Sequence, residues 1–299
     1  MRLRFSKMHG IGNDFVVVDC RERPLALTES AIRRLGDRHF GVGFDQLLTI
    51  EPARDASCAF AYGILNRDGS SAGQCGNGVR AVARWLARAG VLAPGGRARL
   101  ESPSGPVAVE LLDDGRVRAE LGEPRFEADA IPLAVDAATA DAQRASYAID
   151  VAGREVEIGA ASFGNPHALV EVDDVDAAPV AVLGPQIEHA AAFPQGCNVG
   201  FAEIVAPDAI RLRVWERGVG ETLACGSGAC AAVAVLRRRA KLAPVVRVAL
   251  PGGELEIRWD GPGRAVSMCG PAEFVFDGEL DTAMDAERIG NGNSEAERP

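Results

Sequence analysis

The sequence has no uncharged apolar run of the roughly 20 residues that a membrane-spanning helix needs. Its N-terminus also lacks the apolar stretch and small-residue cleavage site of a signal peptide. Acidic residues outnumber basic ones: the formal net charge is −10, and the basic residues are scattered apart from Arg237 to Arg239. Because phosphate binding relies on clustered Lys and Arg, we expect no nucleic-acid partner. The missing apolar run and signal peptide predict a cytoplasmic protein without a membrane partner.

Metal and cofactor signatures are equally scarce. The seven cysteines form no CxxC pair, which argues against a disulfide framework and a zinc ribbon. The four histidines form no close pair of metal ligands. Only two lysines are present, Lys7 and Lys241, and nothing around either resembles a site for pyridoxal phosphate, which binds a lysine as a Schiff base. The sequence therefore predicts free thiols, no metal and no cofactor.

The sequence repeats itself once. Its 299 residues suggest two domains of about 150 residues each. Gln-Cys-Gly-Asn-Gly around Cys75 matches Ala-Cys-Gly-Ser-Gly around Cys225, which lies 150 residues later. Asn66-Arg67 and Glu216-Arg217 each begin nine residues before their cysteine. Gly-Asn steps at 12–13 and 164–165 extend the match upstream, so we expect two similar halves.

Short apolar or alternating segments separated by Gly, Pro and Asp predict β-strands that are mostly joined by hairpins. Each Cys-Gly-x-Gly motif instead opens a helix, expected at 79–89 and 229–236. The second helix is apolar on every face, which predicts that a strongly curved sheet surrounds it. The expected strands are 57–65, 97–101, 107–112, 116–121, 246–250, 254–259 and 264–268, with buried strands at 15–18 and 168–172.

The two Cys-Gly-x-Gly motifs carry the chemistry. A thiol at a helix N-terminus feels the positive end of the helix dipole, so we expect the pKa of Cys75 and of Cys225 to fall toward neutrality. The glycines let backbone N–H groups face a carboxylate or an enolate-like charge. A thiolate on one face of a carbon and a thiol on the other can invert that centre, whereas a lone base returns the proton to its original face. The duplication therefore predicts a racemase or epimerase with its site between the halves.

The remaining cysteines, Cys20, Cys58, Cys197, Cys230 and Cys269, are expected to be small core residues. His167 follows a turn-like Gly-Asn-Pro sequence beside a strand, where it could adjust a thiol pKa. Glu216 is expected to be buried and paired, with a role in catalysis or binding. Four asparagines could be turn formers, but their places beside the repeated motifs favour hydrogen bonds to a zwitterionic substrate; they are Asn13, Asn66, Asn165 and Asn198.

Several stretches, in order along residues 1 to 282, resemble the diaminopimelate epimerase family. The stretch from Glu216 to Gly228 is the most specific of them. The others are Met8 to Phe15, Asp45-Gln46-Leu47, Gln74 to Gly78 and Gly164 to His167.

The resemblance implies interconversion of LL- and meso-diaminopimelate in lysine and peptidoglycan precursor biosynthesis, without a cofactor. It implies that Cys75 and Cys225 are the acid and base, and that His167 and Glu216 modulate their pKa values. The residues that it implies for binding the small-molecule substrate are Asn13, Gln46, Asn66, Gly76, Asn77, Asn165, Asn198, Glu216, Arg217, Gly226 and Ser227.

The implied fold is of the α/β (α+β) class, with two pseudo-symmetric domains, each a strongly curved, mostly antiparallel sheet around a central helix. We expect residues 1–122 and 270–282 to form the N-terminal domain, 123–269 the C-terminal domain, and 283–299 a disordered tail. Arg67, Val79 and Ala81 depart from the family pattern. Phe276 stands where many relatives have a tyrosine that makes dimer contacts. This departure weakens the expectation of a homodimer, although Phe keeps most of the apolar surface.

Two other functions compete with this one. A racemase of the same fold could act on proline or histidine. Proline racemases usually have a histidine after the first Cys-Gly, where this sequence has Asn77, whereas the histidine alternative stays open. From another class, Cys75 and Cys225 could form a regulatory disulfide, because facing thiols of lowered pKa oxidise readily.

Overall fold

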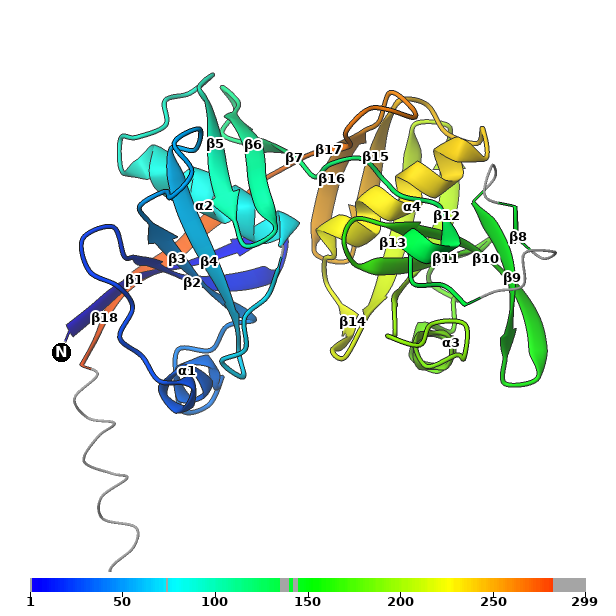
Figure 1. Ribbon diagram of the computed structural model, residues 1–299, viewed down its shortest axis with the longest axis horizontal. Coiled ribbons are helices and arrows are strands. Elements are labelled where there is room, and N and C mark those ends of the chain that lie inside the picture. Colours follow the sequence, from blue (N-terminus) through cyan, green and yellow to red (C-terminus); the bar gives the residue numbers. More distant parts are fainter. Residues whose placement is uncertain (1, 74, 135–139, 142–144, 282–299) are drawn as a thin grey trace, which may run out of the picture.

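The structure is a computed structural model that describes residues 2–73, 75–134, 140–141 and 145–281. Two domains lie side by side (Figure 1). The N-terminal domain contains β1 Arg2–Gly10, β2 Asn13–Asp19, α1 Glu29–Gly36, β3 Gln46–Glu51, β4 Phe60–Asn66, α2 Gly76–Arg88, β5 Arg97–Ser102, β6 Gly105–Leu111, β7 Val117–Glu120 and β18 Glu273–Asp281.

The C-terminal domain follows with the 3-10 turn η1 Ala128–Ala130, β8 Ala140–Asp141, β9 Ser146–Val151, β10 Arg154–Ser162, β11 Pro166–Glu171, α3 Val180–Glu188, β12 Asn198–Ala206, β13 Ala209–Glu216, β14 Gly220–Thr222, α4 Gly226–Arg238, β15 Val245–Leu250, β16 Gly253–Arg258 and β17 Ser267–Gly270. The domain limits expected at 122 and 270 stay a prediction, and the expected tail lies outside the described residues.

Strand pairing shows the pseudo-symmetry of the two halves. In the N-terminal domain, β2 pairs parallel with β3, and β4 pairs parallel with β5. The C-terminal domain repeats both parallel pairs, as β11 with β12 and β13 with β15. The other pairings between described strands are antiparallel. The expected fold class, with mostly antiparallel sheets in two similar halves, is confirmed.

A central helix lies within each sheet (Figure 1). Every residue of α4 from Ala229 to Leu236 is buried, as its wholly apolar sequence predicts. Both central helices begin three residues earlier than expected, at Gly76 and Gly226, because each cysteine is itself the N-cap. The helix starts therefore lie directly beside the two thiols.

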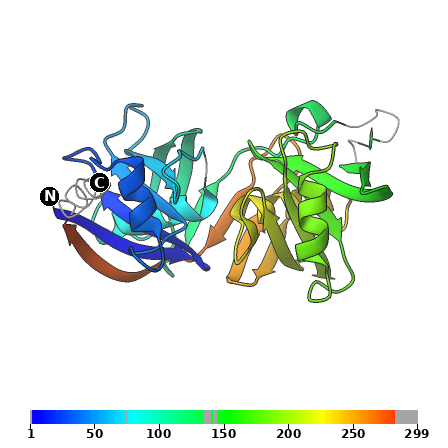
Figure 2. The same ribbon diagram turned by 90° about the horizontal axis from the view of Figure 1, so that it is seen from below.

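Two short helices, α1 and α3, were not predicted from the sequence. They lie on the same side of the molecule, one on each domain (Figure 2). The Oγ1 of Thr28 caps α1 by accepting from the backbone N–H of Ala31 at 3.2 Å. In contrast, α3 contains Pro185, which normally argues against a helix because it removes a hydrogen-bond donor.

Two of the expected strands have later starts than predicted. The segment from 57 begins pairing only at Phe60, because Cys58 closes a turn onto the carbonyl of Asp55. The expected strand at 264–268 runs instead from Ser267 to Gly270, since Arg264 is held in a turn by Trp259 and Gly261. Hydrogen bonds within these turns therefore set where the two strands begin, which the apolar pattern alone did not indicate.

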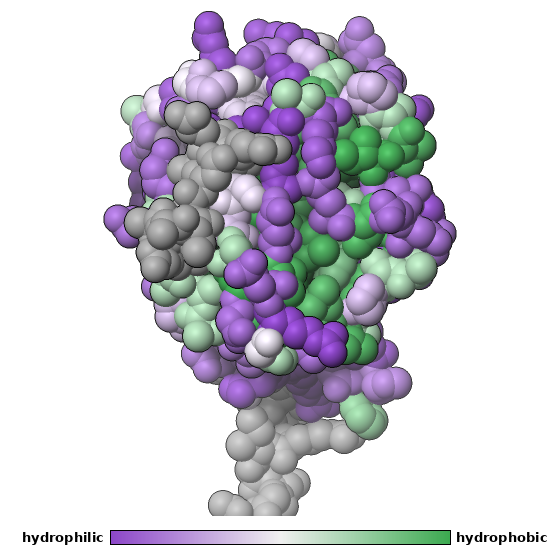
Figure 3. All heavy atoms as spheres, turned by 90° about the vertical axis from the view of Figure 1, so that its right-hand side faces the viewer, coloured by the Kyte–Doolittle hydropathy of each residue, from purple (hydrophilic) through white to green (hydrophobic). Residues whose placement is uncertain are grey.

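The chain crosses between the domains along two neighbouring strands. β7 leads into the C-terminal domain and β17 leads back, and they pair antiparallel with each other (Figure 1). The end of the molecule formed by the C-terminal domain is largely polar, with an apolar patch on one side (Figure 3). Exposed large apolar residues of this domain include Val182 and Val205.

The turn between β1 and β2 makes a further contact between the domains. Ile11 is buried within the core of the C-terminal domain, although it belongs to the N-terminal hairpin. A Cβ built on Gly252 would lie 2.0 Å from the Ile11 carbonyl oxygen, which is backbone and cannot rotate away. Glycine at this position therefore allows the two domains to approach.

Replacement of Gly252 by alanine is expected to push this turn away and to destabilise the protein by about 1–3 kcal/mol, the usual cost of overpacking. Urea denaturation measures the change in the free energy of unfolding. An unchanged denaturation midpoint would show that the contact between Ile11 and Gly252 contributes nothing to domain association.

Candidate active site

Each motif cysteine is the N-cap of a central helix. The Sγ of Cys75 accepts from the backbone N–H of Gly78 at 3.2 Å, and the Sγ of Cys225 accepts from that of Gly228 at 3.4 Å. Both cysteines have extended backbone angles, as N-cap residues normally do. The two halves of the chain thus place a thiol in the same local geometry.

The glycine three residues after each cysteine leaves room for this approach. A Cβ at Gly78 would lie 3.4 Å from the Sγ of Cys75, and one at Gly228 would lie 3.1 Å from the Sγ of Cys225. Such contacts would crowd the sulfur atoms that accept the N–H bonds. The glycines therefore keep the first turn of each helix open to the thiol.

The two helix starts meet across the side chain of Met268, which belongs to the crossing strand β17. An ideal Cβ at Gly76 would lie 2.7 Å from the Met268 Cε, and one at Gly226 would lie 3.0 Å from its Sδ. Asn77 bridges the domains, since its Nδ2 donates to the carbonyl of Ala224 at 3.1 Å. The structure thus brings the two Cys-Gly motifs to one place between the domains.

On the side of the N-terminal domain, Asn13 links the first thiol to Asn77. Its Oδ1 lies 3.7 Å from the Sγ of Cys75 and accepts from the Nδ2 of Asn77 at 3.3 Å. The Nδ2 of Asn13 donates to Asp45 at 2.9 Å, which fixes which end of the amide faces the thiol. Asp45 received no role from the sequence, although it directly precedes Gln46.

Asp45, which binds Asn13, is itself part of a group of hydrogen-bonded charged residues. Arg38 donates to both carboxylates, to Asp14 Oδ1 at 2.8 Å and to Asp45 Oδ1 at 2.7 Å. The buried Lys7 is paired with Asp14 at 2.5 Å. Burial alone would raise the pKa of Asp14, but the hydrogen bonds from Arg38 and Lys7 hold this pKa well below its usual value. Lys7, Arg38 and Asp45 lie 7, 24 and 31 residues from Asp14, so no local pattern in the sequence indicated this group.

Gln46 and Asn66 are neighbours across β3 and β4, with Gln46 Nε2 donating to Asn66 Oδ1 at 3.2 Å. The Oε1 of Gln46 and the Oδ1 of Asn77 are buried and have no hydrogen-bond partner among the described residues. Buried acceptors without partners are costly. Both atoms are therefore suited to accept a hydrogen bond from a ligand.

On the side of the C-terminal domain, Ser227 lies beside the second thiol, with its Oγ 3.7 Å from the Sγ of Cys225. Asn165 donates to the same hydroxyl at 3.4 Å, and its Oδ1 lies 3.1 Å from the Nε2 of His167. His167 is buried, and desolvation lowers its pKa to about 3, so it is neutral near pH 7. A chain of polar groups thus joins His167 to Cys225.

Asn198 and Arg217 are linked through the backbone. The Oδ1 of Asn198 accepts from the N–H of Arg217 at 3.0 Å, and the Nδ2 of Asn198 donates to the Pro166 carbonyl at 3.2 Å. The guanidinium of Arg217 bonds instead to the carbonyl of Gln195 and belongs to an exposed residue. Arg217 is therefore a predicted site residue whose side chain is exposed to solvent.

Glu216 lies beside the second thiol. Burial raises its pKa, while hydrogen bonds from Thr222 and Cys225 act in the opposite direction. The Thr222 hydroxyl donates to Glu216 Oε1 at 2.5 Å. Glu216 also raises the pKa of both motif thiols through its charge, which places it within electrostatic reach of each.

The expected lowering of the thiol pKa values is wrong. Burial raises the pKa of Cys75 to about 11 and that of Cys225 well above its usual value, against the N–H bonds at the helix starts. Desolvation of the thiolate exceeds the effect of the helix terminus. The other five cysteines are buried, as expected for core residues.

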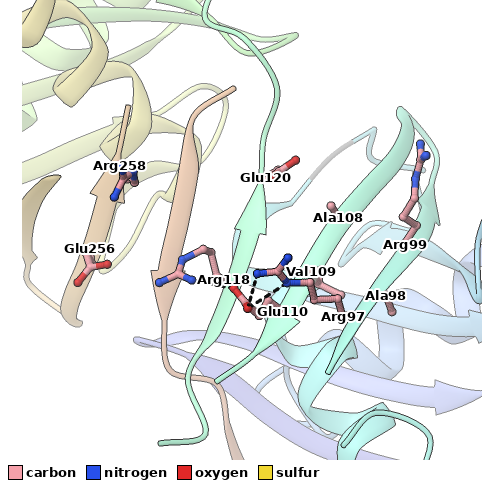
Figure 4. Close-up of a pocket in the computed structure, with 10 residues that line it drawn as sticks. All are labelled: Arg97, Ala98, Arg99, Ala108, Val109, Glu110, Arg118, Glu120, Glu256 and Arg258. Carbon is pink, nitrogen blue, oxygen red and sulfur yellow. Dashed lines mark hydrogen bonds and ion pairs between the residues drawn. The ribbon is translucent and has the colours of Figure 1, made fainter. Parts of the chain in front are cut away.

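The described residues contain no cluster of three or more His, Cys, Asp or Glu side chains that could hold a metal ion. No described helix is long and apolar enough to cross a membrane. The hollow in Figure 4 lies elsewhere, on strands β5, β6, β7 and β16, and no cysteine lines it. Its Glu110 already pairs with Arg97 at 3.0 Å and with Arg118 at 2.7 Å.

Comparison with solved structures supports the fold. A hydroxyproline epimerase from Agrobacterium vitis has a TM-score of 0.67 at 17% identity and covers 93% of this chain, which covers 91% of it. A phenazine biosynthesis protein of the PhzF family from Bacillus anthracis has a TM-score of 0.65 at 14% identity, covering 94% of this chain and 99% of its own. At these identities the likeness concerns the fold alone.

Sequence comparison identifies the family. The family model described as diaminopimelate epimerase matches residues 5–127 and 159–275. The diaminopimelate epimerase of Xanthomonas axonopodis pv. citri is 56% identical, with 93% of this chain and 96% of the relative covered. That of Alkalilimnicola ehrlichii is 50% identical, with 94% and 99% covered. The chain belongs to the diaminopimelate epimerase family.

Proposed function

We propose that this protein interconverts LL- and meso-diaminopimelate, without a cofactor, by moving a proton between Cys75 and Cys225. One observation carries the proposal: two thiols from repeated halves are each the N-cap of a central helix, and the starts of those two helices meet at Met268. The proposed substrate is inferred from the relatives, which are named diaminopimelate epimerase. Lysine and peptidoglycan precursor synthesis is then the role of the reaction.

The proposed reaction needs one thiolate and one thiol. The thiolate takes the proton from the reacting α-carbon, and the electron pair of that C–H bond moves into the adjacent carboxylate as an enolate-like charge. The opposite thiol then donates its proton to the other face and becomes the thiolate. Gly76-Asn77 and Gly226-Ser227 lie at the helix starts, and their backbone N–H groups are proposed to stabilise the substrate carboxylate.

Glu216 and His167 are proposed to tune the two thiols. The Glu216 carboxylate accepts a hydrogen bond from Cys225, and its charge disfavours ionisation of both thiols. His167 is neutral at pH 7 and acts through hydrogen bonding with Asn165, which in turn contacts Ser227. The two thiols thereby have different surroundings, as opposite protonation states require.

A large group of polar side chains is proposed to bind both ends of the substrate, because only one of its two stereocentres reacts. Gln46 Oε1 and Asn77 Oδ1 are buried acceptors suited to ammonium groups. The guanidinium of Arg217 suits a carboxylate. Asn13, Asn66, Asn165 and Asn198 complete the set with Glu216. A pocket that pairs polar groups with both ends rejects simpler amino acids.

Reduced wild-type protein is expected to convert LL-diaminopimelate to the meso isomer with no cofactor added. Cys75→Ala and Cys225→Ala should each lower the rate at least about 10³-fold, because inversion needs a group on both faces. Chiral chromatography of the products measures the conversion. Cys58→Ala, a core cysteine in the N-terminal domain, is the matched control and should keep its activity.

The same assay separates the alternatives. Turnover of proline or histidine in place of diaminopimelate would support a racemase of another specificity. An inactive reduced protein whose binding of another protein changes on disulfide formation would support the redox switch. Undiminished epimerisation by Cys75→Ala would exclude the two-thiol mechanism.

His167 also makes a prediction about acid stability. Its pKa of about 3 in the folded protein lies below the unfolded value of ~6.5. Between these pH values the unfolded chain binds more protons, so stability falls as the pH falls below about 6.5. His167→Gln should remove up to ~1.4 kcal/mol per pH unit of this slope between pH 6 and 4. Denaturation of both proteins across this range measures it, and parallel slopes would contradict burial of a neutral His167.

We also propose a cytoplasmic homodimer. The thiol mechanism requires reduced cysteines, which a reducing compartment maintains. Val275 and Phe276 on β18 are 56% and 48% exposed, and β18 covers one edge of β1, so this strand offers an apolar contact for a second copy. Light scattering in solution should give twice the mass of the chain. Phe276→Asp should shift it toward the monomer, and a monomeric wild-type protein would contradict the proposal.

A further inference from the structure

Arg80 is fully buried in the first central helix, between the two domains. Its exposed fraction is 0%, an unusual environment for a cation. The side chain turns back toward the start of α2, where Nη1 donates to the Gly76 carbonyl at 3.3 Å. Nε donates to the carbonyl of Pro271 at 3.2 Å, just after the crossing strand β17. The guanidinium therefore lies beside the junction at which the thiol motifs meet.

The surrounding chain leaves space for this side chain. An ideal Cβ at Gly10 would lie 3.1 Å from Nη2, and one at Gly270 would lie 3.4 Å from Nε. Nη1 also lies 3.3 Å from the Sδ of Met268, the residue that separates Gly76 from Gly226. Arg80 thus contacts the same methionine as both helix starts.

This position is unfavourable for a positive charge. The start of a helix is its positive end, where cations are disfavoured. No described carboxylate forms an ion pair with Arg80, and its Nη2 has no hydrogen-bond partner among the described residues. A buried, unpaired charge costs free energy, and arginine keeps its charge where other groups would lose theirs. The part of the chain that the structure describes offers it no compensating anion.

Thiols are the ionisable groups around Arg80. Cys75 lies on its own helix, Cys230 on α4 and Cys269 on β17, and a thiolate at any of them would favour the charged guanidinium. Cys230 and Cys269 are buried core residues, whereas Cys75 is partly accessible. Around Cys75 in turn, Arg80 favours the thiolate and Glu216 from β13 opposes it.

We propose that Arg80 is a positioning residue for the proton transfer, whose buried positive charge stabilises the Cys75 thiolate and the negative charge that develops between the two helix starts. The inference rests on the proposed function and adds a residue to its mechanism. The reaction itself then forms the compensating anion that the described residues do not supply. The cation contacts the Gly76 carbonyl directly after Cys75, and the N–H of Gly78 donates to the Cys75 sulfur.

The test is the pH dependence of Cys75 alkylation by iodoacetamide, followed by mass spectrometry of the Cys75 peptide in reduced full-length protein. Only the thiolate reacts. Arg80→Met removes the charge and keeps a long side chain. We expect its alkylation profile to move to higher pH and its rate at pH 8 to fall about tenfold. In epimerisation, kcat should fall at least about tenfold with KM little changed.

Arg84→Met is the matched control. Arg84 lies one turn further along α2 and donates to the carbonyl of Ala272, next to the Pro271 carbonyl that Arg80 uses. Its alkylation profile should equal that of the wild type. Arg80→Lys keeps the charge and should restore most of the rate. Arg80→Gln provides a second uncharged variant, and the profile is read from each one that circular dichroism shows to be folded.

An alkylation profile shared by the wild type and a folded uncharged variant would overturn the proposal, and so would an equal shift in Arg84→Met. Alkylation needs no substrate, so its outcome is separate from that of the proposed function. If the wild type leaves LL-diaminopimelate unchanged while Arg80→Met still shifts the profile, the electrostatic role stands and the substrate assignment fails.

Discussion

The close approach of the two central helix starts across Met268 is the constraint on which the rest of the site depends. Glycine at Gly76 and Gly226 leaves room for that methionine, whose side chain would have to shift if either position carried a Cβ. The close approach also requires the crossing strands β7 and β17 to pair, since β17 carries Met268 between the domains. Asn77 and Ile11 then complete contacts from the N-terminal domain to the other half. The duplicated chain thus makes one site from two equivalent motifs.

Burial and local dipoles act in opposite directions at this site. Desolvation keeps both motif thiols protonated and raises the pKa of Cys75 to about 11, while N–H bonds from the helix starts favour the thiolate. A buried thiol is a stronger base once ionised than a solvated thiol of low pKa, which suits removal of a weakly acidic α-proton. In the proposed mechanism a nearby positive charge would favour the thiolate, and Arg80 is a buried cation that contacts the same junction.

Much of this arrangement could be predicted from the sequence, because the repeat relates residues that are 150 positions apart. The offset between Cys75 and Cys225 indicated two halves, and the apolar faces of α4 indicated a surrounded helix. Other features depend on contacts that no pattern in one sequence reveals. Met268 lies in a short strand with no distinguishing sequence pattern. In the sequence, Arg80 is indistinguishable from an exposed polar residue of a helix. Pro185 argued against a helix where α3 forms. The thiol pKa direction was wrong because burial is a property of the whole fold.

The most direct test of the two-thiol account is the early reaction of LL-diaminopimelate with the wild-type protein in deuterium oxide, followed by mass spectrometry of the separated isomers. A thiol carries a single proton, so the proton taken from the substrate stays on one sulfur while the other delivers deuterium. We predict that the meso product carries one deuterium and that the remaining LL substrate carries none. Deuterium appearing equally fast in the remaining substrate, or a product that retains its original proton, would contradict the account.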